Sequence, residues 1–255
     1  MPKALGGAGR QLRSAAAETK MERMLEKLRE EVLEANLELV RRGLVIFTFG
    51  NASGLAREEG LCVIKPSGVP YDKMKPADMV VTDLDGRIVE GRLRPSSDLE
   101  THVALYRAFP EIGGVVHTHS RHATAWAQAG REIPCFGTTH ADYFHGPIPV
   151  SAPLTAEEIE AGYEANTGVA IIRRLAGTKP LDCPAMLVHG HAPFAWGKDV
   201  ADAAHNAIIV EELATMALET LAINPNAQPL SAAQRDKHFF RKHGPGASYG
   251  QAKTR

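Results

Sequence analysis

The sequence contains few cysteines and no long apolar run. Its 255 residues include three cysteines, Cys62, Cys135 and Cys183, an odd number at distant positions. Their spacing predicts no disulfide framework and no Cys-x-x-Cys metal motif, so we expect a reducing, cytoplasmic compartment. No stretch reaches the roughly eighteen apolar residues that predict a membrane span. Residues 1–20 lack a continuous apolar segment, and we therefore expect no secretory signal.

Neither sign of charge dominates the chain. It has 29 basic and 30 acidic residues, with a formal net charge of −1. This balance predicts neither a nucleic-acid partner nor a membrane partner. Nucleotide-binding motifs of the G-x-G-x-x-G or Walker type are also absent. Histidine, in contrast, is abundant: five of the eleven histidines lie between His117 and His145.

The spacing of apolar residues predicts helices before, between and after a sheet of short strands. Helices are predicted over residues 21–42, 98–106, 120–129, 156–175 and 199–221. Strands are predicted over residues 45–48, 61–65, 79–82, 87–89, 114–119 and 186–188. Residues 50–54 are interpreted as a break after the first strand, residues 138–143 as a loop or strand end, and residues from 224 onward as irregular. Asp85-Gly86 predicts a two-residue hairpin turn, which favours antiparallel pairing.

These elements predict a single α/β domain with a central, mostly antiparallel β-sheet and helices on both faces. The domain is expected to cover residues 21–255. Residues 1–20, rich in Gly, Ala, Ser and Arg, are expected to form a disordered N-terminal extension.

The strongest chemical signal is the segment Val115-Val116-His117-Thr118-His119. Residues i and i+2 of a strand point to the same face, so His117 and His119 are candidate ligands of a divalent metal such as zinc. His189-Gly190-His191 follows another short strand and offers a third ligand. The carboxylate of Asp98 is either an oxygen ligand or a first-turn residue stabilised by the helix dipole. His122 and His140 are competing donors.

Two further groups of residues suggest a substrate site. Three pairs at strand ends or a helix start offer hydroxyls, an amide or open backbone N–H groups, and together they predict a phosphate site: Gly50-Asn51, Ser67-Gly68 and Ser96-Ser97. Each pair alone is also compatible with an ordinary turn or cap. Asp142 and Tyr249 are acid/base candidates, although no local pattern supports either of them.

Taken together, these residues resemble the class II aldolase/sugar-phosphate epimerase family over about residues 21–251. The resemblance rests on Gly50-Asn51-Ala52-Ser53, Ile64-Lys65-Pro66-Ser67-Gly68-Val69, Arg94-Pro95-Ser96-Ser97-Asp98, His117-Thr118-His119-Ser120, Gly137-Thr138-Thr139-His140-Ala141-Asp142-Tyr143-Phe144, Pro193-Phe194-Ala195-Trp196-Gly197-Lys198, Asp236-Lys237-His238, Arg241-Lys242-His243-Gly244 and Tyr249-Gly250-Gln251. Two local departures occur, at Gly190-His191-Ala192 and at Ser248-Tyr249. Neither removes an implied functional group.

The resemblance implies a role for each matching residue. His117, His119 and His191 would bind one zinc ion, or another divalent metal, per subunit, with Asp98 at or near the metal. Asp142 and Tyr249 would be the acid/base pair, and His238 would support them. The loop residues Gly50, Asn51, Ser67, Gly68, Ser96 and Ser97 would bind a sugar phosphate. A homotetramer is also implied, in which the Tyr249 segment reaches a neighbour's site.

The implied reaction is zinc-dependent 4-epimerisation of L-ribulose 5-phosphate to D-xylulose 5-phosphate, as in L-arabinose catabolism. The expected chemistry is cleavage and re-formation of the C3–C4 bond by retro-aldol and aldol steps. The alternatives are a class II aldolase acting on a sugar phosphate such as L-fuculose 1-phosphate, an epimerase of a related pentulose phosphate, or a structural zinc domain.

Overall fold

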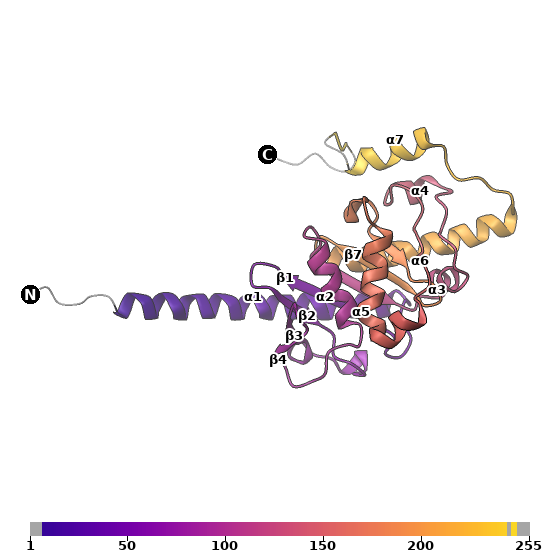
Figure 1. Cartoon of the computed structure of the whole chain (residues 1–255). Helices are drawn as coiled ribbons and strands as arrows, with labels where there is room; N and C mark the ends of the chain where they lie inside the picture. Colours follow the sequence, from indigo (N-terminus) through magenta and orange to yellow (C-terminus); the bar gives the residue numbers. More distant parts are fainter. Residues whose placement is uncertain (1–6, 244–245, 249–255) are drawn as a thin grey trace, which may run out of the picture.

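A seven-stranded antiparallel sheet forms the centre of the molecule (Figure 1). The computed structural model describes residues 7–243 and 246–248, and side chains from residue 18 onward within these ranges. The strands in these ranges are β1 (Gly50–Ala56), β2 (Leu61–Ile64), β3 (Val80–Asp83), β4 (Ile88–Glu90), β5 (Gly114–Thr118), β6 (Ala185–Leu187) and β7 (Pro193–Gly197). Their order is β4-β3-β2-β1-β5-β7-β6, and each neighbouring pair is antiparallel.

Helices cover both faces of this sheet, as predicted. The α-helices of the described ranges are α1 (Gly7–Arg41), α2 (Leu99–Ala108), α3 (Arg121–Gln128), α4 (Thr138–Ala141), α5 (Ala156–Arg174), α6 (Val200–Ile223) and α7 (Ala232–His243). Short 3-10 helices span Tyr71–Lys73, Pro76–Asp78 and Pro180–Asp182. Successive residues of β1 face opposite layers: the Ser53 hydroxyl bonds to His102 of α2, whereas Gly54 packs under Leu28 of α1. The predicted α/β class is therefore confirmed.

The first predicted strand is wrong. Residues 45–48 form an irregular turn, and the segment from Gly50, interpreted as a break, is β1 itself. Small residues are required there because α1 lies close: a Cβ on Gly54 would come within 2.7 Å of Leu28 Cδ1. Pairing with β2 on one side and β5 on the other thus overrides the weak strand propensity of glycine and alanine.

The two ends of the chain are more helical than predicted. α1 begins at Gly7, so residues 7–20 are helical where we expected disorder; residues 1–6 lie outside the described ranges. The run Ala15-Ala16-Ala17 explains this difference, because alanine has the highest helix propensity. The N-terminal half of α1 projects away from the sheet (Figure 1). Near the other end, α7 was missed because the prolines before it suggested irregular chain.

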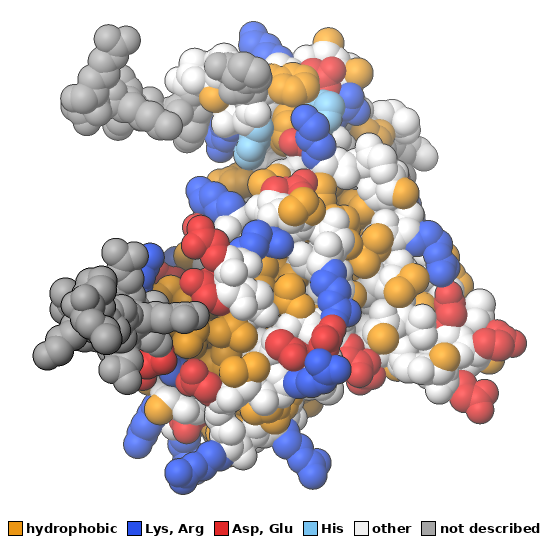
Figure 2. Space-filling model, turned by 60° about the vertical axis from the view of Figure 1, so that its left-hand side comes forward, with side chains coloured by type: hydrophobic (Ala, Val, Ile, Leu, Met, Phe, Trp, Pro, Cys, Tyr) orange, Lys and Arg blue, Asp and Glu red, His pale blue; other side chains and the backbone are white. Residues whose placement is uncertain are grey.

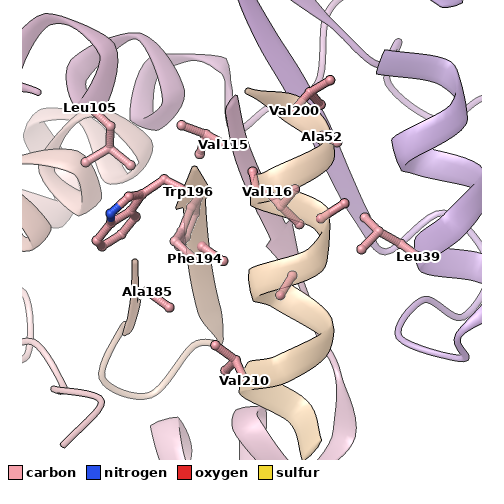
Figure 3. Packing of buried hydrophobic residues seen from close by; sticks show 14 of the residues in the cluster. Leu39, Ala52, Leu105, Val115, Val116, Ala185, Phe194, Trp196, Val200 and Val210 are labelled. Carbon is pink, nitrogen blue, oxygen red and sulfur yellow. The ribbon is translucent and has the colours of Figure 1, made fainter. Parts of the chain in front are cut away.

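The buried core lies on both faces of the sheet. Val115 of β5 and Trp196 of β7 lie side by side on the face toward α2, whereas Val116 lies on the face toward α6, which contributes Val210 (Figure 3). All three cysteines are buried and free of disulfides. No described helix has both the length and the apolar character needed to cross a bilayer. Acidic and basic side chains are interspersed over the face shown in Figure 2.

Candidate active site

Three histidines meet at one end of the central strand. His117 lies in β5, His119 follows directly after it, and His191 lies in the turn between β6 and β7. Their ligand nitrogens all lie within 4.8 Å of one another. The Nε2 atoms of His117 and His191 are only 3.2 Å apart. Three converging imidazoles, with room for a further ligand, are the donor set of a catalytic zinc site.

Hydrogen bonding and burial prepare His117 to bind a metal. Its Nδ1 lies 3.0 Å from the carbonyl oxygen of Pro193, which directs Nε2 toward the other two rings. Its ring also stacks on Phe194, with the centroids 4.2 Å apart. Burial lowers the pKa of His117 to about 3, so the imidazole stays neutral, as metal coordination requires.

The competing histidines all lie outside this cluster. His189 is exposed and lies beside Gly130. His122 interacts with Glu211, its Nδ1 lying 2.8 Å from a carboxylate oxygen, and His140 Nε2 lies 2.9 Å from the carbonyl oxygen of Gly146. The geometry therefore groups His191, rather than any of these, with His117 and His119.

One pocket of about 350 Å³ brings most of the predicted residues together. Its lining includes the three clustered histidines, Asp98 and all six predicted loop residues: Gly50, Asn51, Ser67, Gly68, Ser96 and Ser97. Thr48, Phe49, Lys65, Tyr163 and Glu164 also line it, and the sequence did not single them out. Residues from β1, the loops after β2 and β4, β5 and α5 thus converge on one space.

Asp98 is a pocket residue rather than a helix cap. It occupies the N-cap position of α2, yet its side chain makes no capping hydrogen bond. Instead it accepts a hydrogen bond of 2.6 Å from Asn51 Nδ2. Burial raises the pKa of Asp98, but its interactions with the His117 and His102 rings and this hydrogen bond outweigh burial, so the pKa is lowered overall.

Lys65 contributes a buried cation to the pocket. Its side chain is almost fully buried, and its Nζ lies 3.2 Å from the carbonyl oxygen of Pro66 and 4.8 Å from the ring centre of Tyr71. Burial lowers the pKa of Lys65, although the charge of Asp98 opposes this. One sequence signal could have identified Lys65: it stands at the end of an apolar strand, directly before a Pro-Ser-Gly turn.

Asp142 lies apart from the pocket, on the segment joined to α7. Its carboxylate accepts hydrogen bonds from Arg241, the shortest of 2.8 Å, and lies 3.2 Å from His238 Nδ1 and 3.4 Å from Lys242 Nζ. Burial raises the pKa of Asp142, but the hydrogen bonds from Arg241 and His238 and the charges of Lys242 and Arg241 outweigh burial, so the pKa is lowered overall. The structure thus places His238 within hydrogen-bonding distance of Asp142. Tyr249 lies outside the described residues.

A three-histidine cluster beside a hydroxyl-lined pocket with a buried lysine is typical of metal-dependent enzymes that act on small phosphorylated substrates. Comparison with known sequences narrows this class. Residues 30–218 match the family described as Class II Aldolase and Adducin N-terminal domain, and the chain belongs to this family.

Similar proteins include epimerases and aldolases. The chain is 57% identical over 227 residues to proteins named L-ribulose-5-phosphate 4-epimerase UlaF from Salmonella paratyphi A and Salmonella typhi, which covers 89% of this chain and 100% of each relative. A solved L-fuculose 1-phosphate aldolase shares the fold, with a TM-score of 0.73 and 24% identity over 83% of this chain and 94% of that one. An L-fuculose-1-phosphate aldolase from Thermus thermophilus has a TM-score of 0.63 and 25% identity over 80% and 98%.

Proposed function

We propose that the protein converts L-ribulose 5-phosphate to D-xylulose 5-phosphate by a zinc-dependent 4-epimerisation. The observation that carries this proposal is the shared pocket, in which three neutral histidines lie beside hydroxyl groups and a buried lysine. The 57% identity to named 4-epimerases favours this substrate over other sugar phosphates.

The stereocentre at C4 determines the chemistry. The C4 hydrogen of a 2-ketopentose phosphate is not α to the carbonyl, so it cannot be removed as an enolate proton. The sequence also has no nicotinamide-binding motif for oxidation and reduction at C4. Breaking the C3–C4 bond by a retro-aldol step leaves an enediolate and glycolaldehyde phosphate. The aldehyde then rotates and the bond re-forms on its other face.

His117, His119 and His191 would hold the metal, with Asp98 nearby. When bound, the metal supplies Lewis-acid stabilisation of the negative charge that develops on the substrate oxygens. Zinc fits three neutral imidazoles, and the bond from His117 Nδ1 to the Pro193 carbonyl is the kind of contact that orients a zinc ligand.

The loop residues would retain the phosphorylated fragment while it rotates. Lys65 provides a positive charge inside the pocket, and Ser67 and Ser96 provide hydroxyl groups in its lining. The hydrogen bond between Asn51 and Asp98 links the phosphate side of the pocket to the histidine side. A phosphate held at this end keeps the aldehyde close to the nucleophilic carbon, which favours recombination over release.

Two proton carriers are needed at the C4 oxygen. Cleavage removes the proton of the C4 hydroxyl, and the new alcohol must be protonated from the opposite face. We assign these roles to Asp142 and Tyr249, with His238 in support. Asp142 does not line the histidine pocket of its own chain, so we propose a homotetramer in which a neighbouring subunit completes each site.

Product identification tests the proposed function. Purified, zinc-loaded protein is incubated with a panel of pentulose phosphates and L-fuculose 1-phosphate, and the products are separated. We expect D-xylulose 5-phosphate from L-ribulose 5-phosphate, and loss of turnover on chelation. Release of an aldehyde without epimerisation would instead support the aldolase alternative. Dihydroxyacetone and glycolaldehyde phosphate should yield a pentulose phosphate; no product would contradict the retro-aldol route.

We further propose that residues 21–255 form the catalytic domain and that residues 1–20 lie outside it. The match of the family over residues 30–218 supports this division. The three buried, unpaired cysteines support a reducing compartment such as the cytoplasm.

A further inference from the structure

Helix α5 is sharply bent at Gly162. This residue has φ 146° and ψ 101°, far from helical values and in the region that favours glycine. Glu158 and Arg173 would lie about 22 Å apart along the axis of a straight helix. Their side chains instead form an ion pair of 3.1 Å. The segment before Gly162 therefore folds back along the segment after it.

The side chain of Asn166 holds this bend. Its Nδ2 donates to the carbonyl oxygens of Glu158, at 2.7 Å, and Gly162, at 2.9 Å. A break in a helix deprives carbonyl groups of their backbone partners, and an unpaired buried carbonyl is costly. Asn166 replaces these partners from within the second segment, so it ties the two segments together across the bend.

The second segment is anchored to α2, the helix that begins after Asp98. The hydroxyl of Thr101 donates to the carbonyl oxygen of Glu164 at 2.6 Å. Gly168 allows a close approach, because a Cβ there would lie 2.8 Å from Ala104 Cβ. α2 and α5 lie side by side in Figure 1. The start of the second segment thus has a fixed place relative to the pocket.

Tyr163 and Glu164 are the first two residues after the bend, and both line the histidine pocket. The ring centroids of Tyr163 and His191 are 5.8 Å apart. Adjacent side chains of a continuous helix diverge by about 100° around the axis. At Gly162 the first segment of α5 leaves the axis of the second segment, so no helical turn lies in front of Tyr163 and Glu164. Both side chains therefore reach the histidine pocket.

We propose that Gly162 and Asn166 are positioning residues that set the pocket wall over the histidine cluster through Tyr163 and Glu164. This inference rests on the proposed function. It predicts that loosening the bend impairs substrate binding and turnover without removing a ligand of the metal.

Two variants change the bend and one matched variant does not. Asn166→Ala removes both hydrogen bonds across it. Gly162→Ala disfavours the observed φ. The new methyl group would meet nothing closer than Ala165 Cβ at 3.9 Å, so this variant tests the backbone conformation and introduces no steric clash. Asp199→Ala is the control, because it removes the side-chain cap at the start of α6, a helix whose residues are not among those that line the histidine pocket. A lost cap costs about 1 kcal/mol, which is comparable to the loss of a hydrogen bond.

We expect both bend variants to raise KM about fivefold or more and to lower kcat/KM by at least that factor. Asp199→Ala should leave KM and kcat within about twofold, although its melting temperature falls. Zinc affinity, measured by chelator competition, should stay unchanged in all three variants.

Several results would overturn the positioning role. They are unchanged KM and kcat in both bend variants, an equal kinetic loss in Asp199→Ala, or loss of zinc affinity in the bend variants. Turnover of L-ribulose 5-phosphate by the wild-type protein is measured first. Its absence would refute the proposed function, whereas wild-type turnover with unaffected bend variants would refute the positioning role alone.

Discussion

His117 and His191 face each other with their Nε2 atoms 3.2 Å apart, although they lie 74 positions apart in the chain. Their rings are nearly parallel, at 8°, with centroids 4.9 Å apart. Two nitrogens at this distance need either a shared proton or a shared cation between or beside them. The buried environment lowers the pKa of both rings, mainly through desolvation, and this favours the neutral form that binds a metal.

Replacing His191 should therefore abolish tight zinc binding. His191→Ala leaves two imidazoles, and we expect zinc affinity to fall by about a hundredfold or more, with turnover lost. His189→Ala is the matched control, because His189 is two residues away, exposed and outside the cluster. Equilibrium dialysis against a chelator measures both variants. Equal losses in the two would contradict the assignment of His191.

Replacing Lys65 should weaken binding of the phosphorylated substrate. Lys65→Met keeps the length of the side chain and removes the charge. A charge-assisted hydrogen bond is worth about 1.5–3 kcal/mol, so KM should rise about ten- to hundredfold. Inorganic phosphate should become a correspondingly weaker competitive inhibitor. Lys73→Met removes an exposed lysine elsewhere, and steady-state kinetics should show no change in this control.

Mixed oligomers should test whether the site is shared between subunits. His119→Ala and Tyr249→Phe should each be nearly inactive alone. If a neighbour supplies Tyr249, random mixing of the two variants should restore about a quarter of the sites, because one subunit keeps its histidines and its neighbour keeps the tyrosine. Activity after co-expression measures this. A mixture as inactive as its parents would show that each site is built from one chain.

Acidification should destabilise the protein partly through His140. Burial lowers the pKa of His140 to about 4, from a reference value of 6.5. Between these values the unfolded chain binds a proton that the folded chain excludes, so stability falls as the pH drops from about 6.5 to 4. The contribution is about 2–3 kcal/mol. Urea unfolding at pH 7.5 and 5.0 should show a smaller pH-dependent loss in His140→Gln than in the wild type. An equal loss in the two would contradict this role.

Much of the site was predictable because it lies next to regular elements. The i, i+2 spacing in a strand was sufficient to place His117 and His119 on one side. Tyr163 and Glu164 were not predicted, for a different reason. Each is an ordinary residue in its own segment and becomes a pocket residue only through packing against distant elements.

The amino-acid pattern alone determined the sheet-and-helix class, the existence of a hairpin between β3 and β4, the helix cap at Thr155 and the pairing of His117 with His119, since these follow from local propensity and periodicity. The tertiary structure decided which distant histidine joins that pair, that Gly50–Ala56 is a strand, and that α5 bends at Gly162. These depend on contacts between segments remote in sequence, which no local pattern encodes. The His-x-His segment can therefore be recognised from the sequence, but its partner His191 is brought to it by the pairing of β7 with β5.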